Sequence, residues 1–161
     1  MAKVAIVGTT SWGTALGLAL ARNGTRTRLW ARTEDEAQKL NEDRENAILL
    51  PGAKFPSRLG VTASVKEALD GVAMVIFAVP AQRLLVFQGP FGGHLKRYMV
   101  IVSASKGLEV GSGKRMSQVI AEELDEYFHR NICVLSGPNL AREVAQGSHA
   151  TTVVAAQDIS V

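Results

Sequence analysis

The sequence contains a single cysteine among its 161 residues, and this scarcity excludes two kinds of site. One thiol cannot form an intrachain disulfide, and it cannot belong to a cluster of cysteine ligands around a metal ion. Cys133 lies within an apolar run, where a thiol is most often a buried packing group. We therefore expect no disulfide framework and no metal site.

Long hydrophobic runs and blocks of like charge are also missing. Charges or glycine interrupt every apolar run before it reaches the length of a membrane span, and the N-terminus has no signal-peptide pattern. The net charge of +3 is spread along the chain without a block of lysines and arginines, so nucleic-acid binding is not favoured. We expect a cytoplasmic globular protein with no membrane span.

The most informative segment is a glycine turn at residues 8–13, between a predicted strand and a predicted helix. Gly8 permits a tight turn, Gly13 lets the helix pack closely on the strand, and the helix N-terminus offers N–H groups to a pyrophosphate. The usual middle glycine is absent, because Thr10 occupies its place. A threonine there either displaces the cofactor outward or offers it a hydroxyl. The turn predicts a dinucleotide site, although strand–helix units of other kinds also use glycine turns.

Apolar segments rich in β-branched residues alternate with segments of helical pattern. Strands are predicted at 4–7, 26–31, 74–79, 98–104, 132–135 and 151–155, and helices at 12–23, 34–44, 65–69, 116–128 and 139–146. Several strands are apolar throughout, which indicates a parallel sheet covered on both faces. The alternation predicts a Rossmann-like α/β fold in which a doubly wound, mostly parallel sheet has helices on both faces. Residues 41–58 contain two prolines and no sustained period, so we expect an irregular excursion there.

The end of the second predicted strand indicates which dinucleotide binds. A site that prefers NAD has an acidic residue roughly 20 residues beyond the glycine turn, but this chain has Arg32 there. A guanidinium suits a 2′-phosphate and can stack on adenine. The acids Glu34, Asp35 and Glu36 belong to the next helix, where Thr33 and Glu36 form a capping box. The segment favours NADPH, or use of both cofactors, over NADH alone; the alternative is a solvated strand-end arginine.

Three further segments follow predicted strands, at the edge where ligands bind in open α/β sheets. Residues 78–82 include Pro80, which is placed to begin a further helix and by itself is structural. Lys106 can present an ammonium to a phosphate or a carbonyl oxygen, although lysines are also common on surfaces. Asn139 is placed to cap a helix, and the N-terminus of that helix can receive an anionic substrate.

Taken in order, these segments resemble the N-terminal domain of the soluble bacterial NAD(P)-dependent glycerol-3-phosphate dehydrogenases. The resemblance covers nearly the whole chain. It is carried by Ser11-Trp12-Gly13-Thr14-Ala15, Leu29-Trp30-Ala31-Arg32, Arg44-Glu45-Asn46, Leu50-Pro51-Gly52, Ser105-Lys106-Gly107-Leu108-Glu109 and Leu135-Ser136-Gly137-Pro138.

The resemblance implies an oxidoreductase that reduces dihydroxyacetone phosphate to sn-glycerol 3-phosphate with NAD(P)H, for phospholipid synthesis, as a homodimer. It implies cofactor contacts at Gly8, Thr10, Ser11, Trp12, Gly13, Arg32, Lys106 and Ala141. It implies substrate contacts at Lys106, Gly137 and Asn139, with Lys106 polarising the substrate.

The resemblance also implies that residues 1–161 form the cofactor-binding domain alone. The family's proton-donating lysine and most of its phosphate contacts lie in a helical C-terminal domain that these residues do not include. The chain by itself is therefore expected to bind cofactor weakly and to be inactive. Two alternatives stay open: another two-domain reductase of keto or hydroxy acids, and a non-catalytic module that senses dinucleotides.

Overall fold

The computed structural model describes residues 2–80, 91 and 93–158. These residues form a seven-stranded sheet in the order β3-β2-β1-β4-β5-β6-β7, parallel throughout except that β7 runs antiparallel to β6. The strands are β1 Lys3–Val7, β2 Arg26–Trp30, β3 Leu59–Thr62, β4 Met74–Phe77, β5 Val100–Ser103, β6 Ile132–Ser136 and β7 Val153–Ala156. The helices are α1 Ser11–Arg22, α2 Glu34–Asp43, α3 Val65–Leu69, α5 Met116–Glu123, the 3-10 helix η2 Glu126–Asn131 and α6 Ala141–Gln146.

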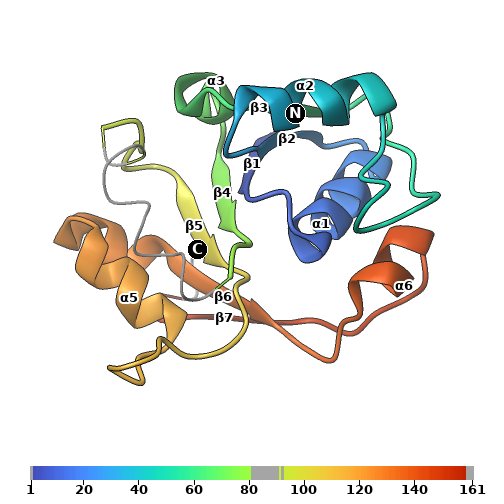
Figure 1. Cartoon of the computed structure of the whole chain (residues 1–161). Coiled ribbons are helices and arrows are strands. Elements are labelled where there is room, and N and C mark those ends of the chain that lie inside the picture. Colours follow the sequence, from blue (N-terminus) through green and yellow to red (C-terminus); the bar gives the residue numbers. More distant parts are fainter. Residues whose placement is uncertain (1, 81–90, 92, 159–161) are drawn as a thin grey trace.

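Two hydrophobic cores lie on opposite faces of the sheet. Alternate residues of β1 separate them: Val4 and Ile6 pack with α1, α2 and α6, whereas Ala5 and Val7 pack with α3, α5 and η2. Figure 1 shows α1 and α6 on the right of the central strands and α5 on the left. The predicted doubly wound, mostly parallel fold with helices on both faces is confirmed. The helix expected after Pro80 falls on residues 81–90, outside the described part of the chain.

Strand β3 is absent from the sequence-based prediction. It has four residues, one of them Gly60, and such a short segment carries little local signal. Its order comes from pairing with β2, in which Leu29 lies opposite Val61. The partner strand therefore defines β3.

The predicted helix over residues 116–128 is wrong in its second half. α5 ends at Glu123, because Leu124 has an extended backbone (φ −113°, ψ 151°), and η2 follows it. The break lets Phe128 enter the core on the α5 face, where the side chain is 2% exposed. Burial of this aromatic ring outweighs the continuation of the helix.

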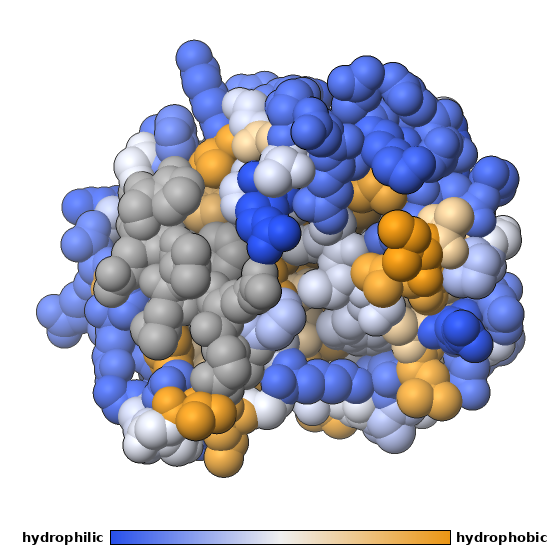
Figure 2. Space-filling view, viewed as in Figure 1, coloured by the Kyte–Doolittle hydropathy of each residue, from blue (hydrophilic) through white to orange (hydrophobic). Residues whose placement is uncertain are grey.

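The irregular excursion between α2 and β3 is held by its polar residues. Arg44 has a left-handed backbone (φ 51°), and its guanidinium donates to the carbonyls of Phe55, Pro56 and Leu59. The carboxylate of Glu45 pairs with Lys54 and accepts the N–H of Gly52, and these hydrogen bonds lower its pKa. Ile48 and Leu49 of this loop are exposed, Ile48 at 85%, and Figure 2 shows an apolar patch on the side of the molecule where Figure 1 draws the loop. The loop therefore buries Glu45 and Asn46 together with Leu50, Ala53 and Phe55, and it leaves Ile48 and Leu49 exposed.

Cys133 is buried in β6, and burial raises the pKa of its thiol. The interpretation of this residue as a packing group is confirmed. Within the described ranges, no cluster of histidine, cysteine and acidic side chains could hold a metal ion. The helices of the same ranges are all too short or too polar to cross a membrane.

Candidate dinucleotide site

The glycine turn joins β1 to α1 through two positions that admit no side chain. Gly8 has a positive φ of 113°, and a Cβ there would lie 2.8 Å from Val79 Cγ1 and 3.1 Å from the Ala78 carbonyl oxygen. A Cβ on Gly13 would lie 2.3 Å from the Gly8 carbonyl oxygen. The N–H of Gly8 donates to the Trp30 carbonyl of β2 at 3.1 Å. The turn therefore packs against the ends of β2 and β4, and no side chain at Gly8 or Gly13 covers its backbone.

Thr10 is the N-cap of α1. Its hydroxyl accepts the N–H of Gly13 at 3.0 Å and donates to the carbonyl of Ala78 at 2.7 Å. Its backbone (φ −60°, ψ 166°) is open to any residue, so no glycine is required at this position. The protein itself uses the donor and one acceptor of this hydroxyl, and a contact between Thr10 and the cofactor stays a prediction. The departure from the usual fingerprint is a helix cap that ties α1 to the end of β4.

Removal of this cap gives a testable prediction. We expect Thr10→Ala to lower the free energy of unfolding by about 1–2 kcal/mol, because the N–H of Gly13 and the Ala78 carbonyl both lose a partner. Thr10→Ser keeps the hydroxyl and should stay within about 0.5 kcal/mol of the parent chain. Urea unfolding of the three proteins measures both values. Equal stability of the alanine and serine variants would contradict the capping role.

The first turn of α1 presents unpaired donors. Among the described residues, the backbone N–H groups of Ser11 and Trp12 have no hydrogen-bond partner, and neither does the buried indole N–H of Trp12. These N–H groups lie at the positive end of a 12-residue helix. Two free amides, a helix dipole and a glycine backbone without side chains fit the pyrophosphate of a dinucleotide.

Asn46, from the excursion after α2, fixes the turn from behind. It is 6% exposed, and its Nδ2 donates to the Thr9 carbonyl at 2.9 Å and to Thr14 Oγ1 at 3.1 Å. Thr14 Oγ1 also donates to the Thr9 carbonyl, at 3.3 Å. No functional role for Asn46 is predicted from the sequence. The sequence signal that could have indicated a buried polar role is the run of three polar residues, Arg44-Glu45-Asn46, at the start of the loop that connects α2 to β3.

Glu36 approaches the turn from α2. Its carboxylate accepts the hydroxyl of Thr9 on one oxygen and the backbone N–H of Arg32 on the other, the latter at 3.3 Å. The predicted capping box is formed in one direction, since the N–H of Glu36 donates to the Thr33 hydroxyl. The reverse bond is replaced by the contacts to Thr9 and Arg32. An acid assigned to the helix start therefore lies between the glycine turn and the end of β2.

Arg32 follows β2 at the carboxyl edge of the sheet and is exposed. Among the described residues, its guanidinium has no hydrogen-bond or ion-pair partner. Arg26 and Arg28 lie toward the opposite edge, and Arg28 pairs with Glu67 at 3.1 Å. Of these three arginines, Arg32 alone is placed near the turn.

Three of the segments singled out in the sequence converge on Lys106. Its ammonium lies 5.3 Å from the centre of the Trp12 ring and donates to the Asn139 carbonyl at 3.1 Å. Trp12 comes from the glycine turn, Lys106 from the loop after β5, and Asn139 from the loop after β6. A cation is therefore held at the carboxyl edge between the nucleotide turn and a polar loop.

The loop after β6 differs from its prediction. Asn139 is not the cap of α6: the N-cap is Leu140, which makes no side-chain cap, and the helix begins at Ala141. Asn139 is instead 5% exposed, its Nδ2 donates to Thr152 Oγ1 at 3.3 Å, and its Oδ1 has no partner in the described ranges. Gly137 has φ 144°, and a Cβ there would lie 2.7 Å from the Thr151 carbonyl oxygen and 2.9 Å from Asn139 Nδ2. Thr151 and Thr152, which precede β7, pack closely against this loop, and the Asn139 side chain bonds to Thr152 instead of the helix end.

Comparison with known proteins identifies the family. The model of the family described as NAD-dependent glycerol-3-phosphate dehydrogenase N-terminus matches residues 3–161. The chain belongs to this family. Curated glycerol-3-phosphate dehydrogenases (NAD(P)+) from Dehalococcoides mccartyi and Corynebacterium glutamicum are 53% and 42% identical to it over 157 and 158 residues. The crystal structure of glycerol-3-phosphate dehydrogenase from Coxiella burnetii superposes with a TM-score of 0.88 at 31% identity and covers 99% of the chain.

The chain spans about half the length of these glycerol-3-phosphate dehydrogenases. It covers 44% and 47% of the two curated relatives and 48% of the Coxiella burnetii chain. Because the family match extends over residues 3–161, it favours a glycerol-3-phosphate dehydrogenase domain over the alternative of another two-domain reductase of keto or hydroxy acids.

Proposed function

We propose that the chain is the cofactor-binding half of an oxidoreductase that reduces dihydroxyacetone phosphate to sn-glycerol 3-phosphate with NADPH or NADH. The observation that carries the proposal is the Lys106 ammonium, held between Trp12 of the glycine turn and the carbonyl of Asn139. A dinucleotide on the turn and a carbonyl substrate at the next strand ends would both lie near this cation. A catalytic site uses such a cation, whereas a non-catalytic sensing module does not require one.

The cofactor contacts follow from the turn. The free N–H groups of Ser11 and Trp12 bind the pyrophosphate, and Gly8 and Gly13 let the backbone approach it. Thr10 contributes by capping α1. Arg32 binds the adenosine end, where its guanidinium suits a 2′-phosphate, and Ala141 at the start of α6 contacts the cofactor as well. When bound, the cofactor supplies the hydride for the reaction.

The substrate contacts lie at the ends of β5 and β6. The Lys106 ammonium donates a hydrogen bond to the substrate carbonyl oxygen and stabilises the negative charge that develops there. Gly137 and Asn139 line the same site, where the backbone carbonyl of Asn139 accepts a hydrogen bond from the Lys106 ammonium. These residues bind and polarise the substrate without supplying the proton that completes the reduction.

The rest of the enzyme lies outside residues 1–161 in this proposal. A helical substrate domain in the remaining half provides the proton donor and most of the contacts to the substrate phosphate. The complete protein works in the cytoplasm as a homodimer and supplies glycerol 3-phosphate for phospholipid synthesis. We therefore expect no oxidation of NADPH when the 161-residue chain is mixed with dihydroxyacetone phosphate. Measurable turnover by this chain would contradict the division of the site.

Arg32→Ala tests the assignment of the adenosine end. We expect the Kd for NADPH to rise about tenfold and that for NADH to change less than twofold, because the charge–phosphate contact is lost with only the first cofactor. Arg26→Ala, which removes the same charge from the other end of β2, is the matched control and should leave both Kd values unchanged. Fluorescence titrations with the two cofactors in parallel measure the ratio. An unchanged ratio in Arg32→Ala would refute the 2′-phosphate contact.

A further inference from the structure

The carboxylate of Glu36 joins the two segments that frame the adenosine end of the proposed site. One oxygen accepts the hydroxyl of Thr9 in the glycine turn, and the other accepts the backbone N–H of Arg32 directly after β2. Its own N–H is capped by Thr33 at 3.3 Å, so the helix backbone that carries the side chain is fixed. Glu36 is partly buried, whereas Glu34 and Asp35 in the same turn are exposed. The structure therefore directs one acid of α2 into the site.

The register of the sheet places this carboxylate. β1 and β2 are parallel neighbours with Val7 opposite Trp30, so the glycine turn and the residues after Trp30 leave the sheet side by side. In folds of this kind the adenosine ribose lies between a glycine turn and the end of the second strand. Glu36 touches both boundaries, so a bound ribose has its 2′ position close to this carboxylate.

We propose that Glu36 is a specificity-determining residue that opposes Arg32 at the 2′ position of the adenosine ribose. A carboxylate accepts hydrogen bonds from ribose hydroxyls and repels a 2′-phosphate, whereas the guanidinium attracts that phosphate. Arg32 lies in the short connection between β2 and α2, and Glu36 lies in the first turn of α2. The balance between these two side chains lets one site accept both cofactors. The inference rests on the proposed function, because it requires a dinucleotide on the glycine turn.

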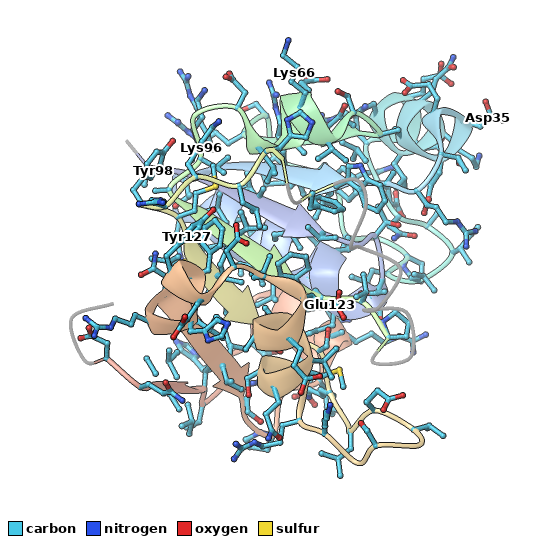
Figure 3. The ribbon with its side chains drawn as sticks, turned by 90° about the vertical axis from the view of Figure 1, so that its left-hand side faces the viewer. Asp35, Lys66, Lys96, Tyr98, Glu123 and Tyr127 are labelled. Carbon is cyan, nitrogen blue, oxygen red and sulfur yellow. The ribbon has the colours of Figure 1, made fainter. Side chains whose placement is uncertain are left out.

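The deciding variant is Glu36→Gln. It removes the charge and keeps an oxygen that can accept the Thr9 hydroxyl. The matched control is Asp35→Asn, which removes the same charge from the same helical turn. Figure 3 shows Asp35 pointing into solvent at the outer edge of the molecule. Titration of the 161-residue chain with NADH and NADPH gives the Kd ratio for each protein, and thermal unfolding confirms that each is folded.

We expect Glu36→Gln to shift the Kd ratio about tenfold toward NADPH, and Asp35→Asn to shift it less than twofold. An equal shift in both variants would overturn the proposal, since it would reflect the overall charge of the helix. An unchanged ratio in Glu36→Gln would also overturn it while leaving the proposed function intact. Glu36→Ser, a smaller uncharged side chain, gives the same ratio test if the glutamine variant is unfolded. Failure of the parent chain to bind either cofactor would instead overturn the proposed function, and this inference with it.

Discussion

Gly13→Ala is expected to lower the free energy of unfolding by about 3 kcal/mol and to abolish measurable binding of NADPH and NADH. The new Cβ would lie 2.3 Å from the Gly8 carbonyl oxygen and 3.3 Å from Ala78 Cβ. The closer of these contacts is to backbone, so relief requires α1 to move away from β1. Alanine favours a helix over glycine by only about 1 kcal/mol, so the clash outweighs the gain. The displaced helix carries the N–H groups of Ser11 and Trp12 away from the pyrophosphate.

Gly17→Ala is the matched control for this prediction. It lies in the same helix, and its Cβ would meet side-chain ends and no backbone: Leu29 and Leu59 at 3.1 Å each and Ile6 at 3.6 Å. Flexible side-chain ends can shift by a few tenths of an ångström, so we expect a change within about 1 kcal/mol and intact cofactor binding. Urea unfolding and fluorescence titration compare the two variants. Equal stability and affinity in both would mean that close packing of the helix on the turn does not matter.

Asn46→Ala is expected to cost about 2–3 kcal/mol of stability and to weaken cofactor binding about tenfold. The substitution removes the donor that Thr9 and Thr14 share, and it leaves buried acceptors without that partner. The Thr9 carbonyl then keeps only the longer hydrogen bond from Thr14 Oγ1, at 3.3 Å, so the peptide planes of the glycine turn are held less firmly. Affinity falls because the amides that face the pyrophosphate are no longer preorganised.

Asn41→Ala separates stability from binding. Asn41 also makes two hydrogen bonds, with the backbone carbonyl of Val61 at 2.7 Å and its N–H at 3.0 Å, but it clamps α2 to β3 instead of the turn. We expect a comparable loss of stability with a Kd within twofold of the parent chain. If Asn46→Ala lost stability but kept its affinity for the cofactor, the loop after α2 would have a purely structural role and no influence on the site.

The parts of the fold that the sequence predicts are those with a local physical signal. Apolar β-branched runs predict the central strands, and the helix predicted over residues 12–23 is observed as α1, Ser11–Arg22, followed by Gly24 with its positive φ. Strand β3 and the break after Glu123 could not be predicted in this way. The first depends on pairing with β2, and the second on the burial of Phe128.

The residues of the candidate site also fall into those with a local sequence signal and those that depend on tertiary contacts. Gly8 and Gly13 could be located because a turn between strand and helix constrains its own residues. Asn46 and Glu36 could not, because their partners in the turn lie 37 and 27 residues away in sequence. Asn139 had the right residue type for a helix cap, yet packing against Thr152 of the next segment decides its orientation. Local chemistry therefore predicts where the turn is, and tertiary contacts decide which side chains serve it.

In the proposed function, the glycine turn and the segments around it bind a dinucleotide. Mapping backbone amide chemical shifts while the isotope-labelled chain is titrated with NADPH tests this binding residue by residue. We expect the largest shifts at residues 8–13, at Arg32 and at Lys106, with α5 and η2 unchanged. Shifts confined to other surfaces, or no shifts at saturating NADPH, would contradict it.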